Sequence, residues 1–172
     1  MARVRSLERE DLPAEHQQIY DDIAGSRGRV QPNFKALLNN PLATSRMAAL
    51  GRYVRFETPL SPRVKALAVL ATARENDGDY VWTVNLPQAR DAGVDEETIQ
   101  AMRERRAPHG LAPEDALIVQ FTLELLRQHR VTDATFQAVQ HSLGDAGVIA
   151  LLILIGYYGS LPHTLSALEV MP

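Results

Sequence analysis

Hydrophobic side chains recur every three to four residues along most of this chain, which is the spacing of one face of an α-helix. The pattern is clear over residues 113–129, where Leu117, Phe121 and Leu125 share a face and charged side chains lie on the other. No segment alternates between apolar and polar residues over a useful length, so no β-strand is predicted. We expect an all-α fold, a compact multi-helix bundle.

Prolines, glycines and capping residues divide this pattern into helices. The expected elements are an extended lead-in over residues 1–11, a helix from Pro13 to a loop at 25–28, helices over 33–38, 41–56, 63–74 and 113–129, a segment from Tyr80 to Gly93, a helix capped by Asp95, one between Thr132 and Gly144, and a long helix from Asp145. Leu50 and Phe136 are expected to face the core. With 172 residues, one domain over residues 1–172 is predicted.

The last helix contains an uninterrupted apolar run, residues 148–155. A helix that is apolar all round is buried, either at the centre of the core or between subunits. The run is shorter than the roughly 20 residues that span a bilayer. We therefore expect no membrane partner.

The most informative stretch is 60–94, which is predicted to form two helices joined at a polar corner. Ser61 and Pro62 are typical of a helix start, and Asn76, Asp77 and Gly78 have turn chemistry. Small side chains on the first helix allow the second to approach closely. A pocket for small-molecule chemistry is therefore expected near the corner.

The text of this stretch, L-S-P-R-V-K-A-L-A-V-L-A-T-A-R, then Y-V-W, then P-Q-A-R-D-A-G-V, resembles the carboxymuconolactone decarboxylase family. That family shares its fold with the alkyl hydroperoxidase D-like proteins. Similar sequence motifs near both ends of the chain extend the resemblance over nearly the whole length. The resemblance implies a homo-oligomer, a trimer or a multiple of trimers.

The chain departs from the family at the positions that carry chemistry. The redox branch has Cys-x-x-Cys-x-x-x-His at the corner and a Glu on the preceding helix. The aligned residues here are Gly78, Val81, Asn85 and Ala66. The cysteine-free branch has a tyrosine, a glutamate, a tryptophan and a histidine, where this chain has Tyr80, Val81, Trp82 and Asn85. The aromatic residues are kept, and the ionisable groups are absent.

A thiol peroxidase needs a reactive thiolate and a second, resolving thiol. The chain contains no cysteine, which excludes this chemistry. We predict a cofactor-independent enzyme that acts on a small carboxylated or cyclic organic molecule by decarboxylation, isomerisation or cyclisation, with a lyase or isomerase favoured. The alternative is a non-catalytic oligomeric scaffold or small-molecule-binding relative that has lost the family's active site.

The candidate catalytic residues are Asn85 and Tyr80, which would orient a carbonyl, and His163, which would move a proton. His163 is chosen for its aromatic neighbours, and its alternative role is to fill a gap in the core. The candidate substrate-binding residues are Trp82, Val81, Arg74, Tyr53 and Tyr157. Arg74 either holds a carboxylate or pairs with Glu75 or Asp77. If the corner lines a cavity, Val81→Glu combined with Asn85→His should be tolerated.

Charge and composition limit the remaining partners. A net charge of -3 and the lack of a basic stripe argue against nucleic acid. Arg103, Arg105 and Arg106 follow one predicted helix, where they complement its dipole or, alternatively, form an anion site. The histidines have no metal-ligand spacing, so no metal or cofactor is expected. The charged N-terminus and the lack of cysteine favour a cytoplasmic location.

Overall fold

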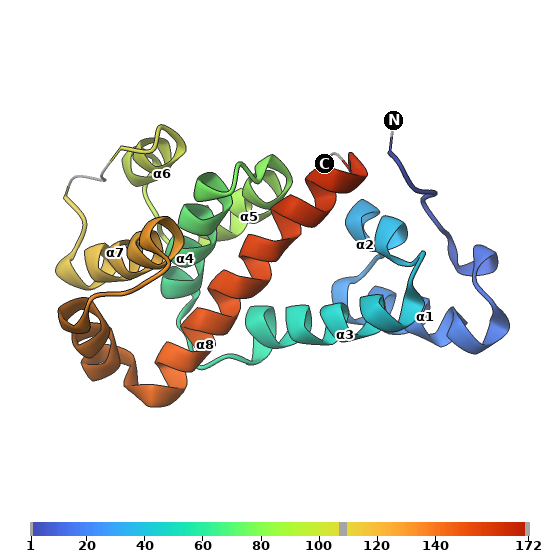
Figure 1. Ribbon diagram of the computed structural model, residues 1–172, viewed down its shortest axis with the longest axis horizontal. Helices are drawn as coiled ribbons and strands as arrows, with labels where there is room; N and C mark the ends of the chain where they lie inside the picture. Colours follow the sequence, from blue (N-terminus) through green and yellow to red (C-terminus); the bar gives the residue numbers. More distant parts are fainter. Residues whose placement is uncertain (1, 107–109, 171–172) are drawn as a thin grey trace. The chain divides into compact units, whose positions relative to one another are not determined.

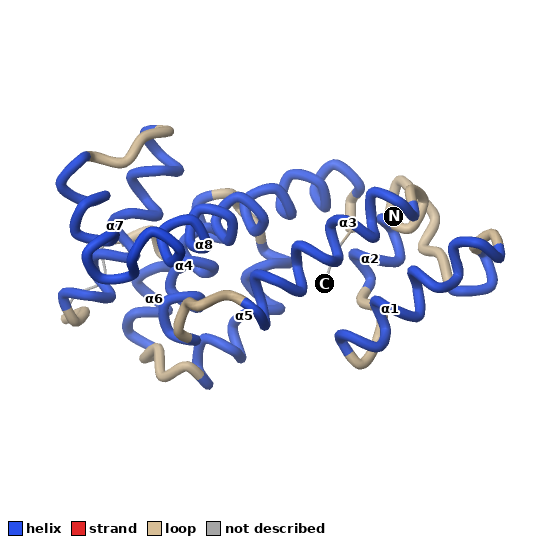
Figure 2. The backbone as a smooth tube through the Cα atoms, turned by 90° about the horizontal axis from the view of Figure 1, so that it is seen from below, coloured by secondary structure: helices blue, strands red, loops and turns tan. Residues whose placement is uncertain are grey.

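The computed structural model describes residues 2–106 and 110–170. In these residues the chain forms α-helices, two short 3-10 helices and one π-helical turn, and no strand (Figures 1 and 2). The α-helices are α1 (Gln17–Arg27), α2 (Pro32–Leu37), α3 (Pro41–Arg52), α4 (Pro62–Glu75), α5 (Asp79–Asp91), α6 (Glu96–Arg103), α7 (Pro113–Gln128) and α8 (Asp133–Leu168). The all-α prediction is confirmed. The oligomeric state stays a prediction.

The chain divides into two compact units. One consists of Met1–Glu57 together with Thr164–Pro172, and the other is Thr58–His163. The prediction of a single domain over residues 1–172 stays a prediction. The corner between α4 and α5 lies wholly in the second unit.

In the first unit, the lead-in is held in place by the helices. Leu7 is buried and its backbone N–H donates to the Lys35 carbonyl at 3.0 Å. Arg3 likewise donates its N–H to the Leu168 carbonyl at 2.9 Å. The expected end of the first helix was wrong, since α1 continues through residues 25–27 and ends at Gly28, whose φ of 75° is favourable for glycine.

In the second unit, α4 is the central helix and packs against α5, α6 and α7. Its start follows the predicted chemistry: the Ser61 hydroxyl accepts a hydrogen bond from the Val64 N–H at 3.2 Å, and Pro62 occupies the first turn. From Leu67 to Ala73 every residue of α4 is buried. Many of these side chains are small, which lets the neighbouring helices approach closely.

Helix α8 bends sharply at Gly144, where φ is 68° and ψ is 174° (Figure 1). The predicted break at this glycine is confirmed. In the following apolar run Leu151 and Leu154 are fully buried, whereas Ile149 is 56% exposed. By length and composition alone α8 could cross a membrane, but a buried core helix passes the same test. The expectation of no membrane partner stays a prediction.

Two residues that were expected to face the core do not. Leu50 on α3 is 41% exposed and Phe136 on α8 is 37% exposed. A helical period shows that residues share a face, but the neighbouring elements decide whether anything covers that face. Val139, predicted on the same grounds as Phe136, is fully buried.

Candidate functional site

The corner between α4 and α5 is a tight turn closed by backbone hydrogen bonds. Asp77 adopts a positive φ of 50°, and the Gly78 N–H donates to the Ala73 carbonyl at 2.7 Å. The Trp82 N–H then donates to the Gly78 carbonyl at 2.8 Å, which begins α5. Asparagine, aspartate and glycine are typical of such a turn, as the sequence indicated.

Gly78 is the residue aligned with the first cysteine of the family's redox branch, and its surroundings leave no room for a side chain. A Cβ atom built here would lie 2.5 Å from Cγ of Pro162 and 3.2 Å from the Ala73 carbonyl oxygen. Proline is rigid and cannot turn aside as a long flexible side chain would. The space of the cysteine is therefore occupied by α8.

The other corner residues are buried in the core or make hydrogen bonds within their own helix. Val81 is 2% and Trp82 is 7% exposed, so both serve the core. The Asn85 amide donates to the Val81 carbonyl of its own helix at 2.7 Å, and Tyr80 is half-buried. Substrate contacts by Tyr80, Val81, Trp82 and Asn85 therefore stay predictions.

His163 does not have the apolar, aromatic setting that suggested a role for it, because its side chain is exposed. It lies three residues after Ser160 and seven after Gly156, so these three exposed residues share one face of α8. Tyr157 and Tyr158 are buried on the other side, where their rings meet edge to face at 5.1 Å. Sequence proximity to aromatic residues was misleading here.

Tyr53 belongs to the first unit, where it begins the π-helical turn Tyr53–Glu57. It is half-buried. Its predicted contact with substrate stays a prediction.

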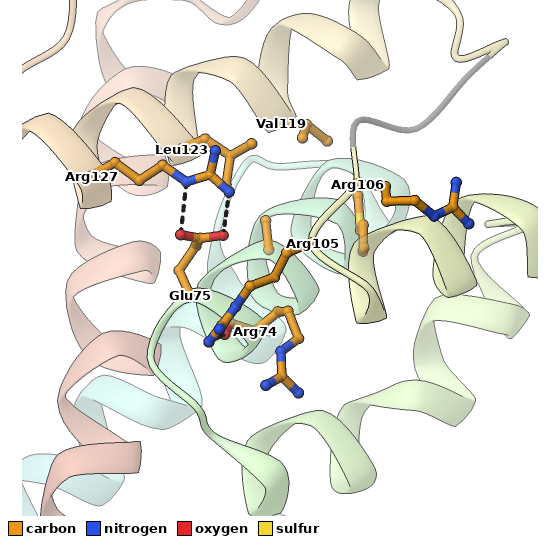
Figure 3. A pocket seen from close by; sticks show the side chains of 9 residues that line it. Arg74, Glu75, Arg105, Arg106, Val119, Leu123 and Arg127 are labelled. Atoms are coloured by element: carbon orange, nitrogen blue, oxygen red, sulfur yellow. Dashed lines mark hydrogen bonds and ion pairs between the residues drawn. The ribbon is translucent and has the colours of Figure 1, made fainter.

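A small cavity of about 80 Å³ lies at the C-terminal end of α4, and of the predicted site residues it includes Arg74. It lies within the second unit and is formed by α4, by α6 with the residues that follow it, and by α7. We call it the arginine cavity (Figure 3). Its lining residues are Ala71, Arg74, Glu75, Met102, Arg105, Arg106, Val119, Leu123 and Arg127.

Glu75 and Arg127 form a two-pronged ion pair across this cavity (Figure 3). Nε and Nη2 of Arg127 donate to the two carboxylate oxygens of Glu75 at 2.8 and 2.7 Å. These hydrogen bonds hold the pKa of Glu75 below its ordinary value, against burial, which acts to raise it. Glu75 is therefore an ionised acceptor in the unliganded cavity.

The remaining guanidinium groups pair with carboxylates at the edge of the cavity, and Arg74 also lies 3.8 Å from Asp79. Arg74 and Arg105 both donate to the same oxygen of Asp77, at 2.8 and 2.7 Å. Nε of Arg74 is buried and has no hydrogen-bond partner among the described residues. Arg106 pairs with Glu104, and its guanidinium points away from the cavity in Figure 3. Four arginines and one acidic residue, Glu75, line the cavity, and the carboxylates of Asp77, Asp79 and Glu104 pair with the arginines from outside the lining. The guanidinium donors beside apolar side chains suit an anion.

The sequence identified some residues of this site but did not show that they lie together in the fold. Arg105 and Arg106 were noted as an alternative anion site, and Arg74 as a holder of a carboxylate. Arg127 was not singled out, although it follows Leu123 and Val119 by one and two helical turns. Arg105 reaches the Arg74 carbonyl at 3.0 Å across 31 residues of sequence. No local pattern could reveal that approach.

Metal ligation has no support from the described residues. Among them, no three His, Cys, Asp or Glu side chains come together in a way that could hold a metal ion.

Residues 41–124 match the model of the Carboxymuconolactone decarboxylase family. This segment runs from the start of α3 into α7 and contains both the corner and most of the arginine cavity. Over these residues, just under half of the chain, the sequence is similar to this family, and the chain contains no cysteine. The resemblance drawn from its sequence is confirmed.

Solved structures share the fold over almost the whole chain. An alkylhydroperoxidase AhpD core structure, a peroxidase-related protein from Ralstonia eutropha JMP134, is 17% identical with a TM-score of 0.80, covering 99% of this chain and 92% of that one. A Cys-to-Ala variant of the debrominase Bmp8 in complex with 2,3,4-tribromopyrrole is 13% identical with a TM-score of 0.78, covering 99% and 91%. No curated protein matches the sequence significantly. At these identities the likeness shows the alkyl hydroperoxidase D-like fold.

Proposed function

We propose that this protein is a cofactor-independent enzyme that acts on a small organic molecule bearing a carboxylate, held in the arginine cavity. The observation that carries the proposal is the grouping of Arg74, Arg105 and Arg127 around an apolar cavity that contains one carboxylate, Glu75. The family match and a neighbour solved with 2,3,4-tribromopyrrole support small-molecule chemistry. The lack of cysteine excludes a thiol mechanism.

Guanidinium groups suit a carboxylate because their planar donors match its two oxygens. The floor of Ala71, Met102 and Val119 excludes water from one side, which strengthens these interactions. At about 80 Å³ the cavity accommodates a carboxylate and a few attached atoms. The arginines therefore orient the anionic end of the substrate.

This arrangement distinguishes decarboxylation from isomerisation. Decarboxylation destroys the substrate's carboxylate, whose charge the arginines would stabilise in the ground state more than in the transition state. Isomerisation by proton transfer keeps that charge throughout. The geometry therefore supports proton-transfer isomerisation best, for example of an oxo acid.

Glu75 is the group we assign as the proton acceptor. A substrate carboxylate that binds Arg127 competes with Glu75 for the same donors. Glu75 then loses hydrogen bonds that favour its charged form while burial persists, so its pKa rises. A C–H bond next to the substrate's carbonyl breaks, its proton moves to Glu75, and the electron pair delocalises into the carbonyl. Glu75 then returns the proton to the enolate at a different atom, which forms the isomer and restores the carboxylate.

The second candidate function is binding without catalysis. It is favoured by the closed corner, where Gly78 meets Pro162 and the Asn85 amide is satisfied within its own helix. In that case the arginine cavity holds an anion, and Glu75 makes no proton transfer.

Levulinate, a small acid with a carbonyl, provides the test. Calorimetry measures its binding, and proton NMR in D2O follows exchange of the CH2 next to its carbonyl. We expect the wild-type protein to bind levulinate and accelerate exchange, Glu75→Gln to bind without exchange, and Arg127→Gln to bind at least tenfold more weakly. Arg90→Gln is the control, because Arg90 pairs with Glu96 outside the cavity.

Two results contradict the proposal. Binding that depends on Arg127, with no exchange by the wild-type protein, supports the non-catalytic alternative. Binding that Arg127→Gln and Arg90→Gln reduce equally, or no binding at all, overturns the arginine cavity as the site.

A further inference from the structure

The arginine cavity shares lining residues with a second, larger hollow along α7. This hollow, of about 350 Å³, lies in the second unit, and we call it the α7 groove. It is lined by Leu111, Ala116, Val119, Gln120, Leu123, Glu124, Arg127 and Gln128. Val119, Leu123 and Arg127 line both hollows, so a single molecule can occupy the two together.

The central polar groups of the α7 groove are already engaged. Glu124 accepts hydrogen bonds from the Thr132 N–H at 2.9 Å and from Gln120 at 2.8 Å. These and further bonds lower the pKa of Glu124 to about 2, so it is ionised at neutral pH. A second anionic group placed in the groove would meet this charge. The surface left for a ligand is apolar, and its members are Leu111, Ala116, Val119 and Leu123.

The two hollows therefore differ in what they can hold. The arginine cavity has guanidinium donors and room for little more than an anionic head, whereas the α7 groove is larger and its free surface is apolar. Arg127 stands where they meet. This polarity is complementary to a molecule with one charged end and an apolar body.

We infer that the ligand is a monocarboxylic acid with an apolar chain or ring, whose carboxylate lies at Arg127 and Arg105 and whose body lies along Val119 and Leu123 in the α7 groove. This inference rests on the proposed function and names its substrate class. The ligand is a free small acid, because the head site is a recess of about 80 Å³.

A series of straight-chain acids from acetate to octanoate measures the contribution of the groove. Each buried methylene should tighten binding about fourfold until the groove is filled, and calorimetry at constant pH and salt reports each Kd. Suberate, the eight-carbon dicarboxylate, should bind at least tenfold more weakly than octanoate because its second charge meets Glu124. The uncharged 1-octanol should also bind at least tenfold more weakly.

Three variants distinguish the contribution of the ligand's carboxylate to binding from that of its apolar chain. Arg127→Gln should weaken all acids by a similar factor and leave the dependence on chain length unchanged. Leu123→Gln should flatten that dependence. Leu117→Gln is the matched control, since Leu117 is also half-buried on α7 but lines neither hollow. Circular dichroism and thermal melting verify that each variant is folded.

The outcomes distinguish a failure of the α7 groove inference from a failure of the arginine cavity as the binding site. If acetate and octanoate bind equally well and both depend on Arg127, the α7 groove inference is overturned and the arginine cavity stands. If Leu117→Gln flattens the series as much as Leu123→Gln, the groove is again the wrong place. If no acid binds, both proposals fail.

Discussion

The corner between α4 and α5 and the arginine cavity both use the C-terminal end of α4, but they differ in packing and charge. At the corner, Val81 is 2% exposed and Pro162 occupies the space beside Gly78. At the cavity, α4, α6 and α7 leave a hollow whose rim carries Arg74, Arg105 and Arg127. At the corner Pro162 fills the space beside Gly78, whereas the cavity has open volume bordered by arginines and Glu75.

The corner keeps aromatic residues that resemble the family's sequence, while the positions aligned with the family's reactive groups carry Gly78, Val81 and Asn85. The aromatic residues of the corner survive because the core needs Trp82, which is 7% exposed. The reactive groups could be replaced, because Gly78 and Asn85 leave the helices intact. Similarity to the family's sequence at this corner is therefore evidence that the residues pack in the same way. Ionisable groups beside an open cavity are better evidence of a reactive site.

The largest expected effect comes from Val81→Glu, which tests whether the corner is core. A carboxylate buried at this position lacks its water shell, so the free energy of unfolding should fall by about 3 kcal/mol or more. Urea unfolding measures the change. Asn85→His, at a half-buried position, is the control and should cost much less. Unchanged stability in Val81→Glu, or in its combination with Asn85→His, would restore the sequence-based expectation of a cavity.

Gly78→Cys should come next, because its side chain overlaps Pro162. We expect a loss of about 1–3 kcal/mol in the free energy of unfolding, measured in urea. Pro162→Ala in the same chain should recover part of it. Gly25→Ala, inside α1 with nothing within 4 Å of its Cβ, should instead be neutral or stabilising. A Gly78→Cys variant as stable as the wild type would show that the contact yields easily.

Glu75→Gln has a smaller effect, which depends on pH. The folded-state pKa of Glu75 is lowered, so the native state binds fewer protons than the unfolded state as the pH falls. The resulting stability is present above the ordinary value of 4.5 and is lost as the pH falls through the folded pKa. The difference in stability between wild type and Glu75→Gln should therefore shrink as the pH falls from about 6 to 3. A difference that is constant over this range would contradict the pairing with Arg127.

Asn85→Ala should have the smallest effect. The Asn85 amide donates to the Val81 carbonyl of its own helix at 2.7 Å. Stability should change by about 0.5 kcal/mol or less, and levulinate binding and exchange should be unchanged. His163→Ala, at an exposed position, should behave likewise. If either variant lost the ability to accelerate deuterium exchange in levulinate, the corner residues would have a catalytic role.

Much of the helical structure could be predicted because its signals are local. Ser61 caps α4 and Asp95 caps α6, each by a hydrogen bond to a backbone N–H three residues later. Gly144 breaks the last helix, as expected from its position. The first helix was ended too early at Gly25, because a glycine inside a helix is tolerated when the turn occurs later, at Gly28.

The candidate site could be predicted only in fragments. Arg74 was selected, and it does line the arginine cavity. His163 was selected for its aromatic neighbours, but it lies on the exposed face of α8. The helical period contained that information, since Gly156, Ser160 and His163 share a face, whereas nothing in the sequence showed that this face is uncovered.

The sequence by itself determined most of the helices, the family resemblance and the exclusion of thiol chemistry, because each depends on local patterns or on composition. Only the tertiary structure decided that Pro162 closes the space beside Gly78 and that Arg127 meets Glu75. These contacts join residues far apart in the chain, and they exist only when packed helices bring their side chains together. An arginine has the same charge wherever it stands, but it forms a site only where other elements supply a cavity and leave its charge partly uncompensated.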